Sequence, residues 1–236
     1  MGKWPKKLPP LTEEQIRISN DFMEYWHTVL PTRVYSLVES FNHGYVVRHA
    51  PMRFSRTLEL GAGLGEHLRY ERLTSDQKQS YFALELRENM ANHIRSRFSE
   101  VQVIVGDCQK QLPFEEDYFD RILAIHVLEH LPDLPSTIRE VYRVCNKERG
   151  VFSVVIPCEG GVAYGLARRV SAQRLFEKRY NQDYTWLVKR EHINLPYELF
   201  EEIGKHFSIS HKAFFPLLVP SITFNLCIGL TLRPKK

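Results

Sequence analysis

Short apolar runs alternate with helical segments in the middle of the chain, and this alternation constrains the fold more than any other feature. The apolar runs span 56–60, 80–86, 101–105, 119–125 and 150–156, and the helical patterns span 66–74, 88–98 and 134–146. This alternation predicts a parallel sheet covered by helices on both faces. After Pro157 the alternation stops, and it resumes with a helix over 196–205 and strands over 207–215 and 222–232. We therefore expect an α/β protein with a doubly wound, mostly parallel sheet of seven strands.

Two helices precede the first expected strand. The spacing of apolar residues predicts one helix over 12–30, which Thr12 and Gln15 can begin with a capping box, and a second helix over 32–47. We expect residues 1–50 to form an N-terminal helical extension. Residues 51–236 would then form one domain, which carries an insert over 159–195 after the fifth strand.

The composition indicates the cellular compartment but leaves the class of ligand open. The 32 basic and 28 acidic residues give a net charge of +4, which suits an anionic ligand without requiring nucleic acid. The four cysteines form no CxxC pair, and the first ten residues lack the apolar core of a secretory signal. We therefore expect free thiols and a cytoplasmic protein. Residues 213–232 carry no charge, but Pro216 and Pro220 would break a spanning helix, so we expect two strands there.

A glycine-rich loop joins the first expected strand to the following helix. Residues 58–67 read LELGAGLGEH, and Gly61, Gly63 and Gly65 let the backbone approach a ligand closely. In an open parallel sheet this turn lies at the carboxyl edge, where ligands bind. Glu66 stands where a dinucleotide site needs its third glycine, and its charge would repel a pyrophosphate. Together with the charge expected on Glu59, the loop therefore favours a positively charged ligand.

Acidic residues end the next two strands. Glu85 lies twenty residues after Gly65, at the tip of the neighbouring strand, where a carboxylate can accept both hydroxyls of a ribose. Asp107 ends the third strand, where it can accept a hydrogen bond from an exocyclic amine such as that of adenine. Taken singly, Glu85 could be a solvated strand end and Asp107 a turn cap. Taken together, three adjacent strand tips offer a ligand loop, a ribose acceptor and an adenine acceptor.

These motifs, with GDCQKQLPFEEDYFDRILAIHVLEHLPD at 106–133, resemble the class I S-adenosylmethionine-dependent methyltransferases. The resemblance is strongest to the methyltransferase type 11-like branch, which acts on quinones, sugars and other small molecules. It covers about residues 55–158 and implies a Rossmann-like fold, the cofactor S-adenosylmethionine and the product S-adenosylhomocysteine. It also implies a cofactor site made of Glu59, Gly61, Gly63, Gly65, Glu85, Leu86, Asp107, Cys108 and His126.

The resemblance implies a role for each part of this site. Glu59, in place of the more usual aspartate, would orient the loop near the methionine end of the cofactor. Glu85 would hold the ribose hydroxyls. Asp107 and the backbone N–H of Cys108 would meet the adenine. His126 would line the boundary between cofactor and acceptor.

The segment HVLEH at 126–130 also matches the H-x-x-E-H pattern of a zinc peptidase. That chemistry needs two histidines four residues apart on one helical face, with a third ligand elsewhere. Pro132 limits any helix here, and no third ligand stands at a known spacing. We therefore expect no metal, and we expect Glu129 and His130 to pack against and cap the following turn.

The insert is basic and aromatic. Between Arg168 and Arg190, seven basic residues stand against two acidic ones, and four aromatic residues are interleaved: Phe176, Tyr180, Tyr184 and Trp186. The resemblance implies that the insert is a substrate cap. Arginines pair with phosphates or carboxylates and aromatic rings stack on flat groups, so the pattern predicts an anionic acceptor with a ring or a sugar. The alternatives are a groove for single-stranded nucleic acid, or a charged helix whose aromatic residues lie in the core.

His192 follows the insert and is a candidate general base. A histidine can remove a proton from a hydroxyl near neutral pH, and Glu191 beside it could orient the ring. We expect His192, with His126 at the cofactor boundary, to act in catalysis. The predicted activity is methyl transfer to a small acceptor, with the oxygen of a sugar or a nucleotide-sugar as the preferred target.

Other functions stay open at this point. A quinone or phenol at a membrane surface is one alternative acceptor, because Leu217, Leu218 and Val219 could touch a lipid bilayer. An RNA-binding methyltransferase and a binding module without turnover are the others. No Asn-Pro-Pro-Tyr motif for amino methylation follows the fourth strand, so we do not expect nucleic acid as a partner. The sequence leaves the choice between a monomer and a homodimer open.

Overall fold

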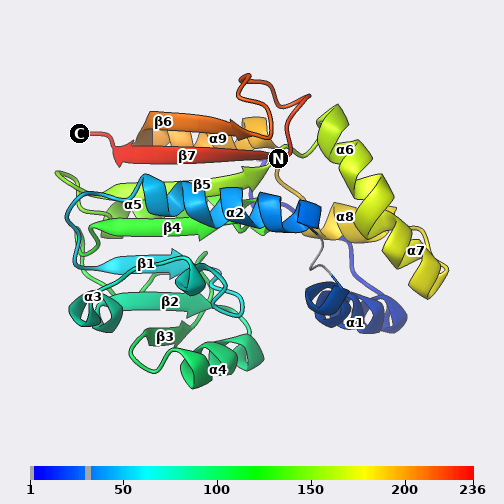
Figure 1. Ribbon diagram of the computed structural model, residues 1–236, viewed down its shortest axis with the longest axis horizontal. Coiled ribbons are helices and arrows are strands. Elements are labelled where there is room, and N and C mark those ends of the chain that lie inside the picture. Colours follow the sequence, from blue (N-terminus) through cyan, green and yellow to red (C-terminus); the bar gives the residue numbers. More distant parts are fainter. Residues whose placement is uncertain (1–2, 30–32) are drawn as a thin grey trace.

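The computed structural model describes residues 3–29 and 33–236. Within these ranges seven strands form one sheet, in the order β3-β2-β1-β4-β5-β7-β6 (Figure 1). The strands are β1 (Thr57–Leu60), β2 (Tyr81–Glu85), β3 (Gln102–Val105), β4 (Arg121–Ile125), β5 (Val151–Pro157), β6 (Phe207–Phe215) and β7 (Cys227–Pro234). Strands β1 to β5 are parallel, and β7 is antiparallel to both of its neighbours. The predicted seven-stranded, mostly parallel sheet is confirmed.

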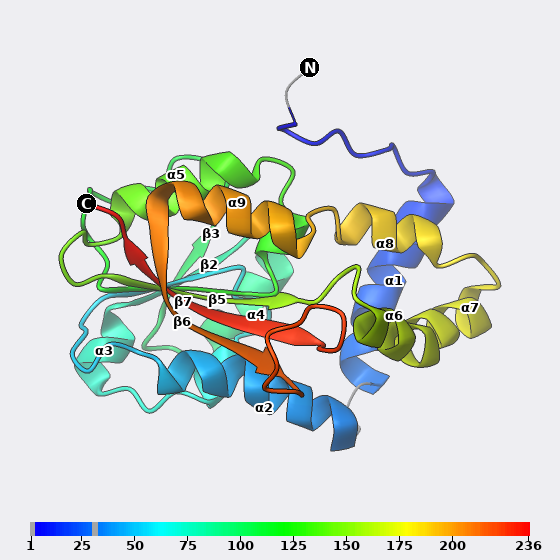
Figure 2. The same cartoon turned by 90° about the horizontal axis from the view of Figure 1, so that it is seen from above.

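Helices cover both faces of this sheet, as the alternation predicts (Figure 2). On one face lie α2 (Arg33–Arg48) and α4 (Glu88–Arg97), and on the other lie α5 (Leu134–Val144) and α9 (Pro196–His206). The central strands present mainly apolar side chains to both layers, because a parallel sheet between two helical layers excludes water from both faces; Glu59 on β1 and Arg121 on β4 are buried charged-type exceptions. Leu58 and Leu60 on β1 contact the α5 and α9 layer, and Leu123 on β4 contacts the α2 and α4 layer.

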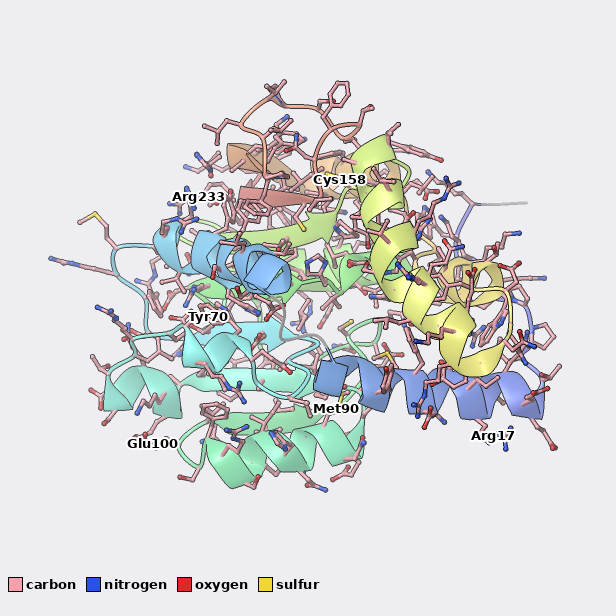
Figure 3. All side chains as sticks on the ribbon, turned by 45° about the vertical axis from the view of Figure 1, so that its right-hand side comes forward. Arg17, Tyr70, Met90, Glu100, Cys158 and Arg233 are labelled. Atoms are coloured by element: carbon pink, nitrogen blue, oxygen red, sulfur yellow. The ribbon has the colours of Figure 1, made fainter. Side chains whose placement is uncertain are left out.

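A second, smaller apolar cluster joins the N-terminal helix to the insert. Helix α1 (Glu13–Val29) packs against the insert helices α7 (Arg174–Tyr180) and α8 (Thr185–Glu191) and against the turn at 169–173, which joins α6 (Val162–Arg168) to α7. These insert elements lie beyond the carboxyl ends of the parallel strands (Figures 1 and 3). We call this group of helices the satellite. The rings of Phe22 on α1 and Phe176 on α7 meet edge to face at 5.1 Å between centroids.

The satellite corrects the expectation that the aromatic residues of the insert face an acceptor. Phe176 is fully buried in the satellite core, and Tyr180, Tyr184 and Trp186 pack against the same cluster. The physical reason is that short helices beyond the edge of the sheet need an apolar core of their own, and these rings supply it. The alternative in which the aromatic residues lie in the core is therefore the one that the structure shows.

The expected helix over 66–74 is wrong. The chain forms only a short 3₁₀ turn at His67–Arg69, and a new helix, α3 (Ser75–Gln79), begins after Thr74. Glu71 lies between these elements, where Arg121 Nη2 and His67 Nε2 reach its Oε1 at 2.6 and 2.7 Å. Because this buried ion pair fixes Glu71, the chain turns inward instead of continuing as an exposed helix.

The two expected N-terminal helices are present as α1 and α2. At the start of α1, Thr12 and Gln15 form the predicted capping box, in which each backbone N–H donates to the other's side chain at 3.0 and 3.2 Å. The expected boundaries at Leu30 and Thr32 lie outside the described residues. The division into an extension, a domain and an insert stays a prediction.

The uncharged stretch 213–232 forms the end of β6, a loop and most of β7, as expected. Among the described residues, no helix combines the length and the apolar character needed to cross a membrane.

Candidate active site

The glycine loop lies at the carboxyl edge, where β1 and β4 are neighbours and the strand order reverses. Gly61, Gly63 and Gly65 have φ values of +60°, +58° and +78°, which L side chains rarely adopt. A Cβ on Gly61 would stand 2.6 Å from Val127, and one on Gly65 would stand 2.9 Å from Phe98. A Cβ on Gly63 would meet Glu66 at 3.1 Å, with no other contact within 4 Å. Gly61 and Gly65 therefore lie against the residues packed beneath the loop, whereas the backbone at Gly63 is open to a ligand.

Glu85 at the end of β2 is held against this loop. Its Oε2 accepts a hydrogen bond of 2.9 Å from the backbone N–H of Gly63, and its Oε1 accepts one of 2.9 Å from that of Arg87. Each carboxylate oxygen has a further lone pair, so the group can accept two more hydrogen bonds from a ligand. Leu86 follows with its side chain 65% exposed.

Asp107 and Cys108 follow β3 on the same edge. One oxygen of Asp107, Oδ1, accepts hydrogen bonds from the backbone N–H and the side-chain Nε2 of Gln109, at 2.9 and 3.1 Å. Burial raises the pKa of the Cys108 thiol to about 12. A thiol that stays protonated at neutral pH is neither a nucleophile nor a metal ligand.

Glu59 lies beneath the loop and does not reach its surface. Its side chain is buried, and its Oε2 accepts a hydrogen bond of 2.6 Å from the Tyr81 hydroxyl. Burial raises the pKa of Glu59 to about 8, so the carboxyl is neutral at pH 7. The expectation that Glu59 adds negative charge to the loop is wrong for this reason.

The edge from β1 to β3 fits S-adenosylmethionine. Glu66 and Glu85 place carboxylates beside the backbone at Gly63, and Asp107 follows β3 further along the same edge. Glu85 keeps two lone pairs for hydroxyl donors. Carboxylates attract a sulfonium and accept hydrogen bonds from ribose hydroxyls and an adenine amine, whereas they would repel a pyrophosphate. The chemistry of the residues present therefore favours a cationic nucleoside over a dinucleotide.

His126 follows β4 and pairs with Glu129. Its backbone has a φ of +54°, and its Nδ1 lies 3.2 Å from Oε1 of Glu129. Burial lowers the pKa of His126, but hydrogen bonds to Cys227 and Glu129 outweigh it and raise the pKa to about 10. For Glu129, burial raises the pKa, but the hydrogen bond from His126 and the charge of His130 bring it to about 2. The two side chains thus form an ion pair at neutral pH.

The same segment does not form the helix that a zinc peptidase needs. Leu128–His130 is a single 3₁₀ turn, and Nδ1 of His130 bonds the backbone carbonyl of Glu191. In the ranges 3–29 and 33–236, no three His, Cys, Asp or Glu side chains are grouped to hold a metal ion. The sequence predicts that His130 packs against the following turn. The structure adds a contact between His130 and the insert that the sequence does not predict.

A second His–carboxylate pair lies between β5 and the insert. Nδ1 of His192, at the end of α8, lies 2.8 Å from Oε2 of Glu159, which follows β5. Arg168 on α6 donates to the other oxygen of Glu159. Burial raises the pKa of Glu159, but the bonds from His192 and Arg168 lower it below its ordinary value. Glu159 is therefore an ionised carboxylate that fixes the His192 ring.

This pair corrects the expected partner of His192. We expected Glu191 to orient the ring, but its carboxylate lies 3.7 Å from Nδ1 of His130, and Glu159 takes the orienting position. Residues adjacent in sequence at a helix end point in different directions, so Glu191 cannot turn toward the ring beside it. The sequence holds a signal for Glu159, because it ends a parallel strand as Glu85 and Asp107 do.

Three cations of the insert have partners within the protein. Arg168 bonds Glu159, Arg179 pairs with Asp21 on α1 at 2.9 Å, and Arg190 donates to the backbone carbonyl of Pro9 at 3.2 Å. These bonds fasten the insert to the edge of the sheet and to the N-terminal segment. They leave Arg169, Arg174, Lys178 and Lys189 as the insert cations whose side chains show neither an ion pair nor a hydrogen bond within the described ranges.

The fold and this edge define a class I S-adenosylmethionine-dependent methyltransferase. Residues 58–154 match the family model described as a methyltransferase domain. These residues belong to that family, and the chain is an S-adenosylmethionine-dependent methyltransferase. A search of curated proteins found no match.

Solved structures share the fold at low sequence identity. One is a TehB-like S-adenosylmethionine-dependent methyltransferase from Corynebacterium glutamicum, with a TM-score of 0.59 and 14% identity over 93% of this chain and 100% of that chain. Another is a possible histamine N-methyltransferase from Thermotoga maritima, with a TM-score of 0.60 and 20% identity over 93% and 99%. A third is the 1,6-didemethyltoxoflavin-N1-methyltransferase of Burkholderia thailandensis with bound S-adenosylhomocysteine, with a TM-score of 0.58 and 15% identity over 98% and 94%.

Proposed function

We propose that this methyltransferase acts on a hydroxyl oxygen of a small, sugar-like or anionic acceptor, with His192 as the general base. The observation that carries the proposal is the Nδ1–Oε2 distance of 2.8 Å between His192 and Glu159. Glu159 follows β5 and His192 follows α8, and Figure 1 shows α8 beyond the carboxyl ends of the parallel strands, the edge at which the glycine loop follows β1.

The glycine loop and the next two strand tips would hold the cofactor. Glu85 would accept the ribose hydroxyls, Asp107 and the backbone of Cys108 would meet the adenine, and Gly63 would let the backbone lie against the ligand. Glu59 would support the loop from below as a neutral group. When bound, S-adenosylmethionine supplies an electrophilic methyl group on a positively charged sulfur.

Glu159 determines which nitrogen of His192 can accept a proton. An ionised carboxylate accepts hydrogen bonds, so Nδ1 of His192 carries the hydrogen and Nε2 carries the lone pair. Nε2 would then take the proton of the acceptor hydroxyl as its oxygen attacks the methyl carbon. Arg168 holds Glu159 from its other oxygen and acts as a positioning residue.

His126 would act differently from His192. Its ion pair with Glu129 keeps the imidazole protonated near neutral pH, so it cannot serve as a base there. A protonated imidazole donates hydrogen bonds. We therefore assign to His126 the binding of an acceptor oxygen at the boundary with the cofactor.

A phenol or quinone acceptor is the second candidate. Two observations favour it: the ring of Tyr164 is stacked with that of His192 at 6.2 Å, and Leu218 beyond the insert is 92% exposed. An aromatic acceptor could extend this stack. Two of the similar solved structures are of an N-methyltransferase and a possible N-methyltransferase, so amines belong in the acceptor screen. We do not expect nucleic acid as a substrate.

The test is an acceptor screen followed by a pH profile. S-adenosylhomocysteine release would be measured with sugars, nucleotide-sugars, phenols, quinols and amines. With the accepted hydroxyl compound, His192→Gln should lower kcat by about 100-fold, which is typical for the loss of a general base. Glu159→Gln should lower kcat about tenfold and shift the acidic limb of the pH profile, because the base at His192 loses its ionised partner.

His206→Gln is the matched control, because His206 ends α9 at the opposite edge of the sheet. It should leave kcat and the pH profile unchanged. Turnover of the His192→Gln variant within twofold of the parent, with S-adenosylhomocysteine bound equally well, would reject the base. Acceptance of amines alone would reject the oxygen as the methylated atom.

A further inference from the structure

Helix α6 has two faces with opposite chemistry. On the face toward the site, Tyr164 stacks with His192 and Arg168 bonds Glu159. On the other face, Val162, Leu166 and Val170 recur every four residues along α6 and the turn that follows it, and each is more than half exposed. Apolar residues at this spacing form one stripe along a helix. Side chains of this size are exposed at a cost, so the stripe indicates a partner.

The loop between β6 and β7 extends this apolar stripe. The backbone N–H of Ala163 on α6 donates to the carbonyl of Thr223 in the loop at 2.9 Å, and Figures 1 and 2 show α6 and the loop side by side. The loop exposes four apolar side chains: Leu217, Leu218, Val219 and Phe224. Two segments that are far apart in sequence thus present one apolar surface, which we call the α6–loop surface.

Positive charges border this surface. Arg169 and Arg174 lie in the turns around Val170, Lys178 lies one turn further, and all three are exposed. Within the described ranges none of them has an ion-pair partner, whereas Arg168 and Arg179 do. The acid in this stretch, Glu177, accepts a hydrogen bond from Gln173.

We propose that the α6–loop surface binds an anionic lipid bilayer. Exposed aliphatic side chains beside unpaired cations match acyl chains beneath negatively charged headgroups. A second copy of this chain fits less well. Twofold pairing through the α6–loop surface would bring the arginines of both copies together, and like charges there oppose association.

The Glu159–His192 pair lies on the opposite side of α6 from the α6–loop surface. Arg168 is on the same helix as Leu166 and bonds Glu159, so a docked α6 would hold the Glu159–His192 pair next to the bilayer interface. In Figure 3, Cys158, the residue before Glu159, is labelled beside α6. The docking proposal itself needs no turnover and is independent of the proposed base.

Flotation with lipid vesicles tests the proposal. The full chain would be mixed with vesicles of phosphatidylcholine alone or of phosphatidylcholine with phosphatidylglycerol. We expect it to float with the anionic vesicles, and less so as salt rises, because salt screens the headgroup charges. Leu166→Glu and Leu218→Glu should each weaken partitioning at least about tenfold, because each removes a large apolar contact with the acyl chains.

Met52→Glu is the matched control, because Met52 is fully exposed before β1, at the amino edge of the sheet. It should float as the parent protein does. Three results would overturn the proposal: a parent chain that floats with neither vesicle, glutamate variants that float as well as the parent, or a parent dimer that Leu166→Glu dissociates. The last result would identify a second copy as the partner.

Discussion

The Tyr81 hydroxyl on β2 donates a 2.6 Å hydrogen bond to Glu59 on β1, and both side chains are buried beneath the glycine loop. Burial raises the pKa of Glu59 to about 8, and the tyrosine bond only partly opposes it. The glycine loop therefore rests on a neutral acid at physiological pH. A buried neutral carboxyl that accepts a hydrogen bond supports the loop without the cost of a buried charge.

Glu59→Gln should flatten the dependence of stability on pH. The native carboxyl has a higher pKa than the unfolded one, so the native state binds more protons and stability falls as pH rises from about 4.5 to 8. Glu59 contributes a slope of up to about 1.4 kcal/mol per pH unit. Glutamine keeps an acceptor for Tyr81 and does not titrate. Urea unfolding should show a gain for the variant at pH 9 relative to pH 5, and parallel pH curves would contradict the account.

Gly61→Ala should disrupt the loop. The new Cβ would stand 2.6 Å from Val127 in a backbone with a φ of +60°, so we expect a loss of about 1–3 kcal/mol in the free energy of unfolding. S-adenosylhomocysteine binding should weaken as well. Gly165→Ala in α6 is the control, because its Cβ meets nothing within 4 Å and alanine favours a helix. Equal destabilisation by both changes would show that the loop geometry is unimportant.

Phe176→Ala should loosen the satellite before the sheet. A buried phenylalanine reduced to alanine costs about 3–5 kcal/mol, and here the loss falls on the cluster shared with Phe22. Hydrogen exchange should quicken in α1 and α7 while β4 and β5 stay protected. Phe224→Ala, at an exposed position, should change neither region. Equal acceleration across satellite and sheet would show that they unfold as one unit.

The mostly parallel sheet could be predicted because short apolar runs alternate with helical segments along the middle of the chain. The region after Gly65 could not, because its shape depends on a contact between residues far apart in sequence, Arg121 and Glu71. Thr74 and Gln77 form a capping box that the sequence does carry, and it marks the start of α3. The packing of the insert could not be predicted, because its aromatic rings contact a helix more than 150 residues away in sequence. Tyr180, for example, bonds Asp21 on α1, 159 residues before it.

The candidate site residues could be identified mainly from their position at the ends of strands. Glu85 and Asp107 were found by that rule, and their roles in binding stay predictions. Glu159 obeys the same rule but is separated from His192 by the whole insert, so their contact depends on how α6 to α8 fold back. The protonation state of Glu59 also required the structure, because it depends on burial and not on residue type.

The role of Glu85 is tested most directly by isothermal titration with S-adenosylhomocysteine. Glu85→Gln removes the charge that the ribose hydroxyls would meet, so we predict binding at least about tenfold weaker than in the parent. Glu88→Gln, exposed at the start of α4, should bind as the parent does. A thermal scan of both variants checks that the loop stays folded. Equal affinity of the Glu85→Gln variant and the parent would contradict the proposed cofactor site.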